Sequence, residues 1–248
     1  MDNRVIEIIN LIKKEGYDAY LVGGGCRDEL LGIPYFDIDI TTNAHPDVII
    51  NLFEVKSDKG KPFGNVKIVY KGLEAEITTF RKETYYYPSV YPKIQGFCKT
   101  IKEDYVRRDF TVNALYMDEN QKVIDPCNGL KDLHNKTLDF ILNPQIRIKE
   151  DPSRILRAIR LKEKLKFEFS KKTKQAILEN VEQMLRLSKN KLANEIKKTY
   201  DECGIIHTNK AFDEFLITET LFGYKREFVS NNASKVDLDT ILAQLKSL

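Results

Sequence analysis

Two aspartates separated by one residue are the side chains in this sequence whose spacing best suits metal chemistry. Asp37 and Asp39 alternate with Phe36, Ile38 and Ile40, a period-two pattern that predicts a strand with one apolar face and one acidic face. The rise of a strand places the two carboxylates about 7 Å apart. Mg²⁺ in proteins prefers one or two carboxylates together with phosphate oxygens. The pair therefore suits a magnesium ion that also holds a polyphosphate.

Three glycines precede this strand and could supply the other half of a phosphate site. Gly23, Gly24 and Gly25 follow a short apolar run at residues 20–22 and lead into a predicted helix that ends at Gly32. Backbone amides at such a turn suit phosphate. A glycine triplet alone is usually a turn, and alternating aspartates alone are usually a solvated face. Their occurrence together, in strand–turn–helix–strand order, favours a nucleotide site; no Gly-Lys-Ser/Thr follows, which excludes a P-loop.

These residues also carry a family resemblance. Gly-Gly-x-x-Arg-Asp at residues 23–28, followed by Asp-Ile-Asp-Ile at residues 37–40, resembles the head of class II tRNA nucleotidyltransferases and bacterial poly(A) polymerases. Both belong to the polymerase-β-like nucleotidyltransferase superfamily. The resemblance implies that Asp37 and Asp39 are catalytic and bind two Mg²⁺ ions, one activating an RNA 3′-hydroxyl and one neutralising the leaving pyrophosphate. It also implies that three residues hold the triphosphate: Gly23, Gly24 and Arg27.

A pair of predicted strands could add a third carboxylate. Residues 64–70 and 73–80 alternate like strands, with a hairpin turn at residues 71–72. Glu74 and Glu76 share one face of the second strand, and that face is as readily a polar surface as part of a cleft. In the family that the chain resembles, a carboxylate immediately precedes the segment matched by residues 77–81. The resemblance therefore implies Glu76 as the third catalytic residue.

The next segment, residues 82–96, shows no clear period and contains four tyrosines. We predict a long loop, and loops of this length are usually functional or disordered. Exposed tyrosines can stack on nucleic acid bases, but a tyrosine-rich loop can equally pack on its own domain. The resemblance identifies the segment as the family's flexible loop. Residues 90–92, Val-Tyr-Pro, stand where the family often has Arg-Arg-Pro.

Two arginines beside an aspartate form a further candidate site. Arg107, Arg108 and Asp109 could be a structural ion pair, which is the commoner outcome, or could grip phosphate and ribose. The segment resembles the family's Arg-Arg-Asp-Phe-Thr-x-Asn-Ala motif. This implies that Arg108 and Asp109 bind the nucleotide near its ribose 2′-hydroxyl and that Asn113 supports the site. The Asp-Pro-x-x-Gly-x-x-Asp-Leu motif at residues 125–133 is interpreted as a hinge without chemistry.

A predicted helix that begins near residue 152 carries three arginines. Asp151 stands where an ordinary N-cap stands, before a proline. Arg154, Arg157 and Arg160 recur every three residues and form a basic ridge. The segment resembles the family's Glu-Asp-x-x-Arg motif, which implies that Asp151 and Arg154 read the Watson–Crick edge of the incoming base. Aspartate accepts from an exocyclic amine and arginine donates, which suits C and A over G and U. Arg157 and Arg160 are assigned to nucleotide binding with them.

Charge and cysteine usage narrow the class of protein. Residues 140–200 contain 16 Lys and Arg and 7 Asp and Glu, which gives this segment a net charge of +9. The whole chain has a net charge of +3, so the remaining residues carry −6. An acidic part joined to a basic part suits a metal site beside a polyanion, although a lysine-rich helical surface is also common. Four scattered cysteines without a Cys-x-x-Cys predict no zinc site and suit a reducing cytosol. No apolar run approaches membrane-spanning length, so we expect a cytoplasmic protein that contacts no membrane.

We therefore predict an α+β fold: a nucleotidyltransferase head with a mixed sheet at residues 1–140, then an all-helical neck and C-terminal extension at residues 141–248. The predicted function is Mg²⁺-dependent transfer of CMP or AMP from CTP or ATP to an RNA 3′ end. Addition of CCA to tRNA is the leading prediction. A poly(A) or A-adding polymerase is the alternative within the class. A non-catalytic nucleotide- or RNA-binding module is the alternative outside it. The resemblance covers about residues 18–200, and the family usually continues with further helical body and tail domains.

Overall fold

The computed structural model describes residues 1–222, so the end of the predicted helical extension, residues 223–248, lies outside the described residues. The chain divides into two units. The first, which we call the head unit, contains Met1–Thr84 and Pro92–Asn135. The second, the helical unit, contains Tyr85–Tyr91 and the chain from Lys136 onward. The chain therefore passes between the units at three places.

A seven-stranded sheet forms the centre of the head unit, in the order β3-β4-β5-β2-β1-β8-β9. Strands β2 and β5 are parallel, and the other neighbours are antiparallel. This mixed sheet confirms the predicted α+β head. The strands are β1 (Ala19–Leu21), β2 (Asp39–Thr42), β3 (Glu54–Ser57), β4 (Asn65–Tyr70), β5 (Leu73–Thr79), β8 (Tyr116–Met117) and β9 (Val123–Ile124).

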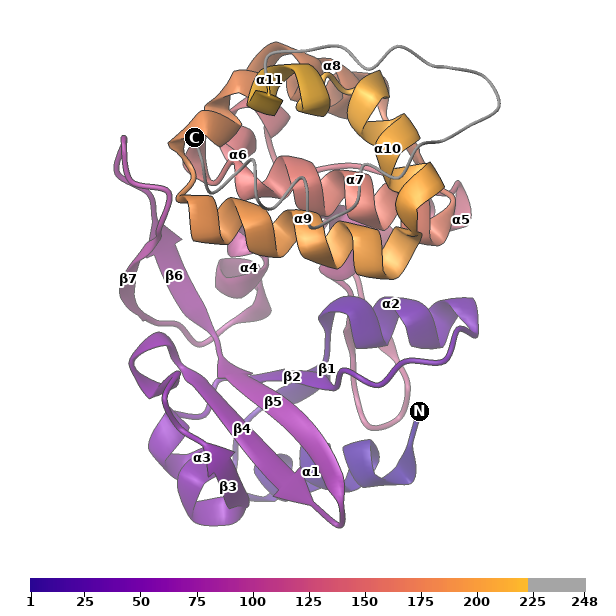
Figure 1. Cartoon of the computed structure of the whole chain (residues 1–248). Helices are drawn as coiled ribbons and strands as arrows, with labels where there is room; N and C mark the ends of the chain where they lie inside the picture. Colours follow the sequence, from indigo (N-terminus) through magenta and orange to yellow (C-terminus); the bar gives the residue numbers. More distant parts are fainter. Residues whose placement is uncertain (223–248) are drawn as a thin grey trace. The chain divides into compact units, whose positions relative to one another are not determined.

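Helices cover both faces of this sheet. Figure 1 shows α2 on one side of β1 and β2, and α1 with α3 on the other. An amphipathic segment at the N-terminus forms α1, whose Val5, Ile8, Ile9 and Ile12 are buried. His45 caps α3, and Pro46 is the first residue of that helix. The helices are α1 (Asn3–Lys14), α2 (Gly23–Leu31), α3 (Pro46–Leu52), α4 (Ile101–Asp104) and α5 (Gly129–His134).

The strand predicted from residue 36 begins later than expected, and Phe36 was wrongly assigned to its buried face. Strand β2 starts at Asp39, and Phe36 is 90% exposed, whereas Ile38 and Ile40 are buried as predicted. The neighbouring Tyr35 is half-buried, and its hydroxyl donates a hydrogen bond to Glu29 at 2.7 Å. The preceding Gly-Ile-Pro segment keeps the chain irregular here, so the alternation does not extend back to residue 36.

The prediction of an irregular loop over residues 82–96 is wrong at both of its ends. Strands β6 (Arg81–Thr84) and β7 (Lys93–Phe97) pair as an antiparallel ribbon with a register shift between Lys82 and Glu83. A two-stranded ribbon has no buried face to impose a regular apolar alternation, so its sequence shows no clear period. Residues 85–91, which we call the tip, connect the two strands.

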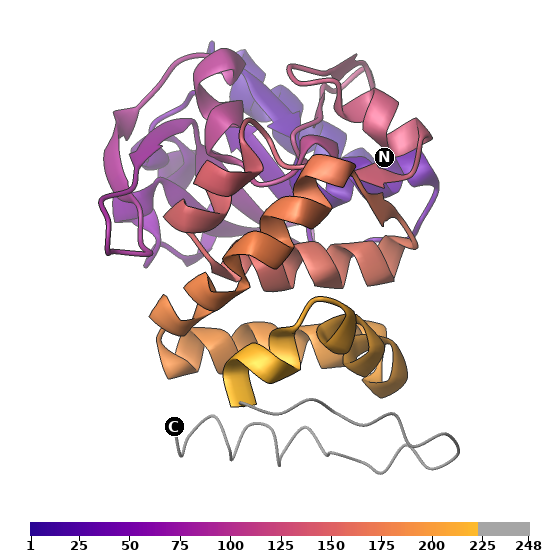
Figure 2. The ribbon, with the colours of Figure 1, turned by 90° about the horizontal axis from the view of Figure 1, so that it is seen from above.

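The helical unit is built from packed helices (Figure 2) and one pair of two-residue parallel strands, β10 (Thr137–Leu138) and β11 (Glu168–Phe169). Ile155, Leu156 and Ile159 of α7 are fully buried. No helix within residues 1–222 is long and apolar enough to cross a membrane. The helical segments are α6 (Pro144–Glu150), α7 (Ser153–Leu165), α8 (Lys171–Asn180), the 3-10 segment η4 (Val181–Arg186), α9 (Lys189–Cys203), α10 (Ile205–Glu214) and α11 (Ile217–Phe222).

Candidate active site

The glycine turn and the aspartate pair meet at the start of β2. Val22 donates its backbone N–H to the carbonyl of Asp39 at 2.9 Å, which aligns the end of β1 with Asp39. Gly23 follows with φ +69°, and a Cβ placed there would lie 3.3 Å from Asp39 Oδ2. A side chain at this position would be strained and would crowd the carboxylate. Glycine therefore lets the first turn of α2 lie directly against Asp39.

A third carboxylate lies on the opposite flank of Asp39. In the parallel pair of β2 and β5, Asp39 is in register with Glu76, so both side chains occupy the same face of the sheet. Glu76 accepts a hydrogen bond from Asn65, and Lys67 Nζ lies 3.3 Å from Glu76 Oε2. Glu74, the other candidate, is 64% exposed in its side chain and pairs with Lys56. The register therefore sets Glu76, and not Glu74, beside Asp39.

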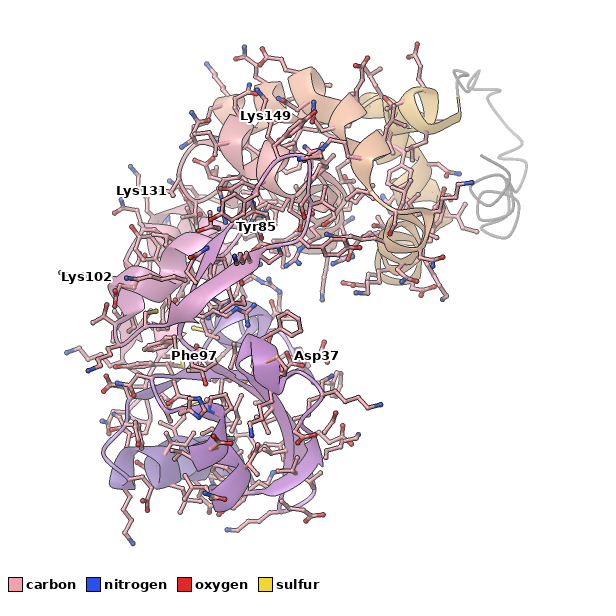
Figure 3. All side chains as sticks on the ribbon, turned by 90° about the vertical axis from the view of Figure 1, so that its left-hand side faces the viewer. Asp37, Tyr85, Phe97, Lys102, Lys131 and Lys149 are labelled. Atoms are coloured by element: carbon pink, nitrogen blue, oxygen red, sulfur yellow. The ribbon has the colours of Figure 1, made fainter. Side chains whose placement is uncertain are left out.

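Negative charge accumulates at this place. Burial is the main reason that the pKa of Asp39 is raised to about 6, and the charges of Glu76 and Asp37 add to the rise. The positive charges of Arg108 and Lys67 act in the opposite direction. Asp37 itself is exposed, in the irregular segment before β2 (Figure 3). A buried carboxylate with negative neighbours is a suitable ligand for a cation, because the cation would offset both the burial and the repulsion.

A polar cavity of about 270 Å³ opens here, and Asp37, Asp39 and Glu76 are among its lining residues. Within residues 1–222, no three His, Cys, Asp or Glu side chains are grouped closely enough to enclose a metal ion by themselves. The residues that could hold one are Asp37 and Asp39. Further oxygen ligands would then come from a bound polyphosphate and water, the arrangement that Mg²⁺ commonly takes.

Arg27, predicted to hold the triphosphate, is 3% exposed. Its Nε donates to Asp28 Oδ1 at 2.7 Å, and its Nη1 donates to Asn113 Oδ1 at 2.5 Å. A Cβ on Gly24 would lie 3.5 Å from Arg27 Nη2. The guanidinium therefore lies under the glycine turn and joins it to Asn113, which is also a predicted site residue.

The Arg-Arg-Asp segment surrounds one buried carboxylate, Asp104, whose exposure is 0%. Arg107 Nε donates to it at 2.8 Å, Arg108 Nη2 at 3.1 Å and the Tyr116 hydroxyl at 2.9 Å. Asp104 and Tyr116 were not among the predicted site residues, although an aspartate four residues before an arginine is a usable signal. The predicted ribose residue Asp109 is 8% exposed and accepts the backbone N–H of Phe110 at 3.0 Å.

The motif interpreted as a hinge also braces this segment. Asp125 Oδ1 accepts the backbone N–H of Gly129 at 2.8 Å, at the start of α5. A Cβ on Gly129 would lie 2.3 Å from the carbonyl oxygen of Thr111, closer than any side chain allows. The Thr111 hydroxyl donates to Asp132 at 2.6 Å. Thr111 begins the 3-10 turn η3 (Thr111–Asn113), so the two motifs fix each other and the position of Asn113.

In the helical unit, the predicted base-reading pair occupies the junction of α6 and α7. Asp151 Oδ1 accepts the backbone N–H of Ser153 at 3.1 Å and its hydroxyl at 2.7 Å, so it does act as a cap. Lys191 Nζ of α9 lies 2.9 Å from the same oxygen. Arg154 is 4% exposed, and its Nη1 donates to the carbonyl of Arg147 at 2.7 Å and to Glu150 at 3.0 Å.

The other two arginines of the predicted ridge differ from Arg154. Arg160 pairs with Glu195 of α9 at 2.7 Å and with Glu202 at 3.4 Å. Arg157 of α7 is exposed. The ridge therefore contains one arginine held inside the helical unit, one on its surface and one in an ion-pair network with α9.

The amino-acid sequence is similar to a known domain and to known enzymes. A profile of the poly(A) polymerase head domain matches residues 19–139. The CCA-adding enzyme of Lactobacillus helveticus is 37% identical over 244 residues, which are 98% of this chain and 59% of that enzyme. The CCA-adding enzyme of a Geobacillus species is 39% identical over 195 residues, 79% of this chain and 48% of that enzyme.

The same relationship appears among solved structures. The crystal structure of the Bacillus stearothermophilus CCA-adding enzyme in complex with CTP matches with a TM-score of 0.78 and 32% identity, over 88% of this chain and 52% of that one. The Thermotoga maritima CCA-adding enzyme complexed with tRNA_CCA matches with a TM-score of 0.71 and 26% identity, over 91% of this chain and 53% of that one. The chain belongs to the class II tRNA nucleotidyltransferase family.

The sequence similarity to class II tRNA nucleotidyltransferases covers the head unit and continues beyond it. The head-domain match at residues 19–139 contains the aspartate pair, Glu76 and the Arg-Arg-Asp segment. Asp151 and Arg154 lie after its end, within the longer match to the Lactobacillus enzyme. The chain spans between about half and three fifths of the length of the curated relatives it matches, 48% and 59% in the two described above.

Proposed function

We propose that this chain transfers CMP and AMP from CTP and ATP to the 3′ end of an RNA, with tRNA as the acceptor. The observation that carries the proposal is that Gly23 leaves no room for a side chain, since a Cβ there would lie 3.3 Å from Asp39 Oδ2, and that Asp39 lies in register with Glu76. A glycine turn beside carboxylates suits a metal-bound triphosphate. Support also comes from the solved relatives, described as complexes with CTP, with ATP and with tRNA_CCA.

The metal proposed for this site is Mg²⁺, held by Asp37 and Asp39. The fit rests on the donor set, which is carboxylate oxygen only, and on the raised pKa of Asp39, which a cation would lower again. When bound, such an ion supplies charge neutralisation for phosphate groups and activation of an attacking hydroxyl. Glu76 lies in register with Asp39 and contributes a further negative charge to the same cavity.

The remaining proposed roles follow from donor and acceptor chemistry. Backbone amides at Gly23 and Gly24 bind phosphate oxygens, and Arg27 with Asn113 keeps that turn in place. Arg108 and Asp109 bind the ribose side of the nucleotide, where a carboxylate can accept from the 2′-hydroxyl. The residues proposed to read the base are Asp151 and Arg154, with Arg157 and Arg160 as supporting contacts along α7.

The test is single-nucleotide incorporation on tRNA that lacks its 3′-terminal CCA, with each of the four triphosphates alone and with or without Mg²⁺. We expect CTP alone to give incorporation of CMP, and ATP to give incorporation of AMP only on an acceptor that already ends in two CMP residues. Asp39→Asn should lower kcat by about 10²–10⁴-fold, because a metal clamp is worth several kcal/mol. Glu74→Gln is the matched control, since Glu74 shares the face of β5 but pairs with Lys56, and it should retain near-normal turnover.

The same experiment separates the alternatives. A product that grows by many AMP residues on any RNA indicates a poly(A) polymerase. Absence of incorporation with all four triphosphates, in a folded protein that still binds them, indicates a binding module and overturns the proposed transfer reaction. Normal turnover of Asp39→Asn would remove Asp39 from the site.

A further inference from the structure

The aromatic ring of Phe36 lies in water beside the carboxylates of the candidate site. Phe36 is 90% exposed, the highest value for a large hydrophobic residue within residues 1–222. It directly precedes Asp37 and lines the cavity of about 270 Å³ that Asp39 and Glu76 also line. A single exposed apolar side chain elsewhere on a surface would need no explanation. This one borders the place where the reaction is proposed to occur, so its position is informative.

Phe36 is accessible from a second side as well. It also lines a neighbouring cavity of about 570 Å³, together with Ile33, Tyr35 and Leu73. A side chain that borders two cavities contributes little to the packing of the core, because solvent reaches it from both. Such a ring is available to stack on a planar group of a ligand.

The backbone that carries Phe36 is anchored on both sides. Before it, the Tyr35 hydroxyl donates a hydrogen bond to Glu29 at 2.7 Å. After it, the carbonyl of Ile38 accepts the backbone N–H of Glu76 at 2.8 Å, and Ile38 is buried. The exposed ring is therefore presented from a fixed segment next to Asp37. A residue held in this way has less conformational freedom to lose when a ligand binds.

Two lysines bring positive charge to the same cavity. Lys56 and Lys67 are among its lining residues, and each is paired with a glutamate of β5, Lys56 with Glu74 and Lys67 with Glu76. Exposed ion pairs of this kind are weak, so the lysines can turn towards phosphate groups. An aromatic ring next to exposed cations is the combination that binds single-stranded nucleic acid, since the ring stacks on a base and the cations attract the backbone.

The two flanks of Asp39 indicate which substrate meets the ring. The glycine turn at Gly23 lies against Asp39 on the side of β1, whereas Glu76 lies on the side of β5. In phosphoryl transfer the attacking and leaving oxygens lie roughly in line across the phosphorus. With the triphosphate on the glycine flank, as proposed above, the attacking 3′-hydroxyl approaches from the flank of β5. Phe36 lines the cavity on that flank.

We propose that Phe36 stacks on the base of the 3′-terminal nucleotide of the acceptor RNA and so positions its 3′-hydroxyl beside Asp37 and Asp39. The inference rests on the proposed function, because it takes these aspartates as the place of transfer. It assigns Phe36 to the acceptor and not to the incoming triphosphate. Stacking on a ring accepts any base, since every base has a π-face. This tolerance suits an acceptor whose last base changes as nucleotides are added.

The test is a thermodynamic cycle between residue 36 and the terminal base, measured in the full chain without triphosphate. The dissociation constant is determined by fluorescence anisotropy for a 5′-labelled tRNA ending in two CMP residues, and for the same RNA whose last nucleotide is abasic. Phe36→Leu keeps an apolar side chain but has no π-face. It should raise the Kd of the intact RNA about 5- to 150-fold, the contribution of one base stacked on an aromatic ring.

Removing the terminal base should weaken binding to the wild type by a similar factor. Removing both partners should cost no more than removing one, because the two losses concern the same contact. Phe36→Tyr retains the ring and should retain the tight binding. Since Phe36 is exposed, these replacements should leave the free energy of unfolding nearly unchanged.

Phe63→Leu is the matched control. Phe63 ends the 3-10 turn η1 (Lys61–Phe63) of the head unit, is 54% exposed and is not among the residues that line either cavity. It should leave the Kd of both RNAs unchanged. The proposal is overturned if Phe36→Leu binds the intact RNA as tightly as the wild type, or if it weakens the intact and the abasic RNA by the same factor.

A calorimetric titration with CTP supplies the second arm. Phe36→Leu should bind CTP as the wild type does, and a loss confined to CTP would assign the ring to the incoming nucleotide and overturn the proposal. Neither measurement requires turnover. A wild type that extends RNA but shows no coupling between residue 36 and the terminal base refutes the stacking inference alone, whereas failure of the proposed transfer reaction would appear as absence of RNA extension.

Discussion

Replacement of Asp104 by asparagine tests how the head unit holds Arg108 near Asp39. Asp104 has no exposed surface and accepts hydrogen bonds from Arg107, Arg108 and Tyr116. In Asp104→Asn one acceptor oxygen becomes a donor that faces these donors, and two buried guanidinium groups lose the negative charge of Asp104. Removing one partner of a buried ion pair costs about 3–5 kcal/mol. We expect a loss of this size in the free energy of unfolding at pH 7.

The pH dependence of the free energy of unfolding gives a second, independent value for the contribution of Asp104. Burial alone would raise the pKa of Asp104, but Arg108 and Arg107 outweigh it and lower that pKa from 3.8 to about 2. Because the folded-state pKa lies below the unfolded one, the stabilisation is complete above about pH 4 and is lost as the pH falls towards 2. The shift corresponds to about 2 kcal/mol at pH 7. Asparagine does not titrate, so the stability gap between wild type and variant should narrow by about 1 kcal/mol between pH 5 and pH 3.

The assay is urea unfolding followed by circular dichroism at pH 7, 5, 4 and 3. Asp201→Asn is the control, because Asp201 forms an exposed pair with Lys197 on α9. Exposed pairs contribute about 0–1 kcal/mol. A cost below 1 kcal/mol for Asp104→Asn at pH 7, or a gap that stays constant from pH 5 to pH 3, would refute this account of Asp104.

Two further predictions concern the same part of the head unit. Gly129→Ala should lower the free energy of unfolding by about 1–3 kcal/mol, measured in urea, because the added Cβ meets the Thr111 carbonyl at 2.3 Å; unchanged stability would mean that the close approach is absent. Asp109→Ala should narrow the ratio of kcat/KM for ATP over dATP, since the 2′-hydroxyl loses its proposed acceptor; an unchanged ratio in a folded variant would make Asp109 a structural residue.

Local sequence patterns predicted the strands that carry Asp39, Glu74 and Glu76. The alternation on both sides of the turn at residues 71–72 gave the β4–β5 hairpin, because register in a hairpin follows from the turn and the apolar face. The family motif selected Glu76 over Glu74 as a catalytic residue. That role stays a prediction, and the parallel register of β2 with β5 now supplies the proximity to Asp39 on which it depends.

Other features depend on contacts between distant residues, which no local pattern contains. Both Tyr35 and Phe36 are aromatic, and only the packed structure shows that Tyr35 contacts Glu29 while Phe36 is exposed. The interpretation of residues 125–133 as a hinge omitted the approach of Gly129 to Thr111, 18 positions earlier in the chain. Lys191 was not singled out as a partner of Asp151, because 40 residues separate them.

These long-range contacts change how loss of activity in the family motifs should be interpreted. Arg27 was assigned to the triphosphate from its motif, yet its guanidinium is buried and bonds Asp28 and Asn113. Removing it leaves the carboxylate of Asp28 buried without its counter-charge, so an Arg27 variant can lose activity through a displaced glycine turn alone. If Arg27 contacts phosphate directly, its removal would weaken binding of the triphosphate more than binding of the nucleoside. If its removal displaces the glycine turn, the stability of the head unit would fall as well. Measuring both quantities distinguishes contact with the ligand from support of the residues that contact it.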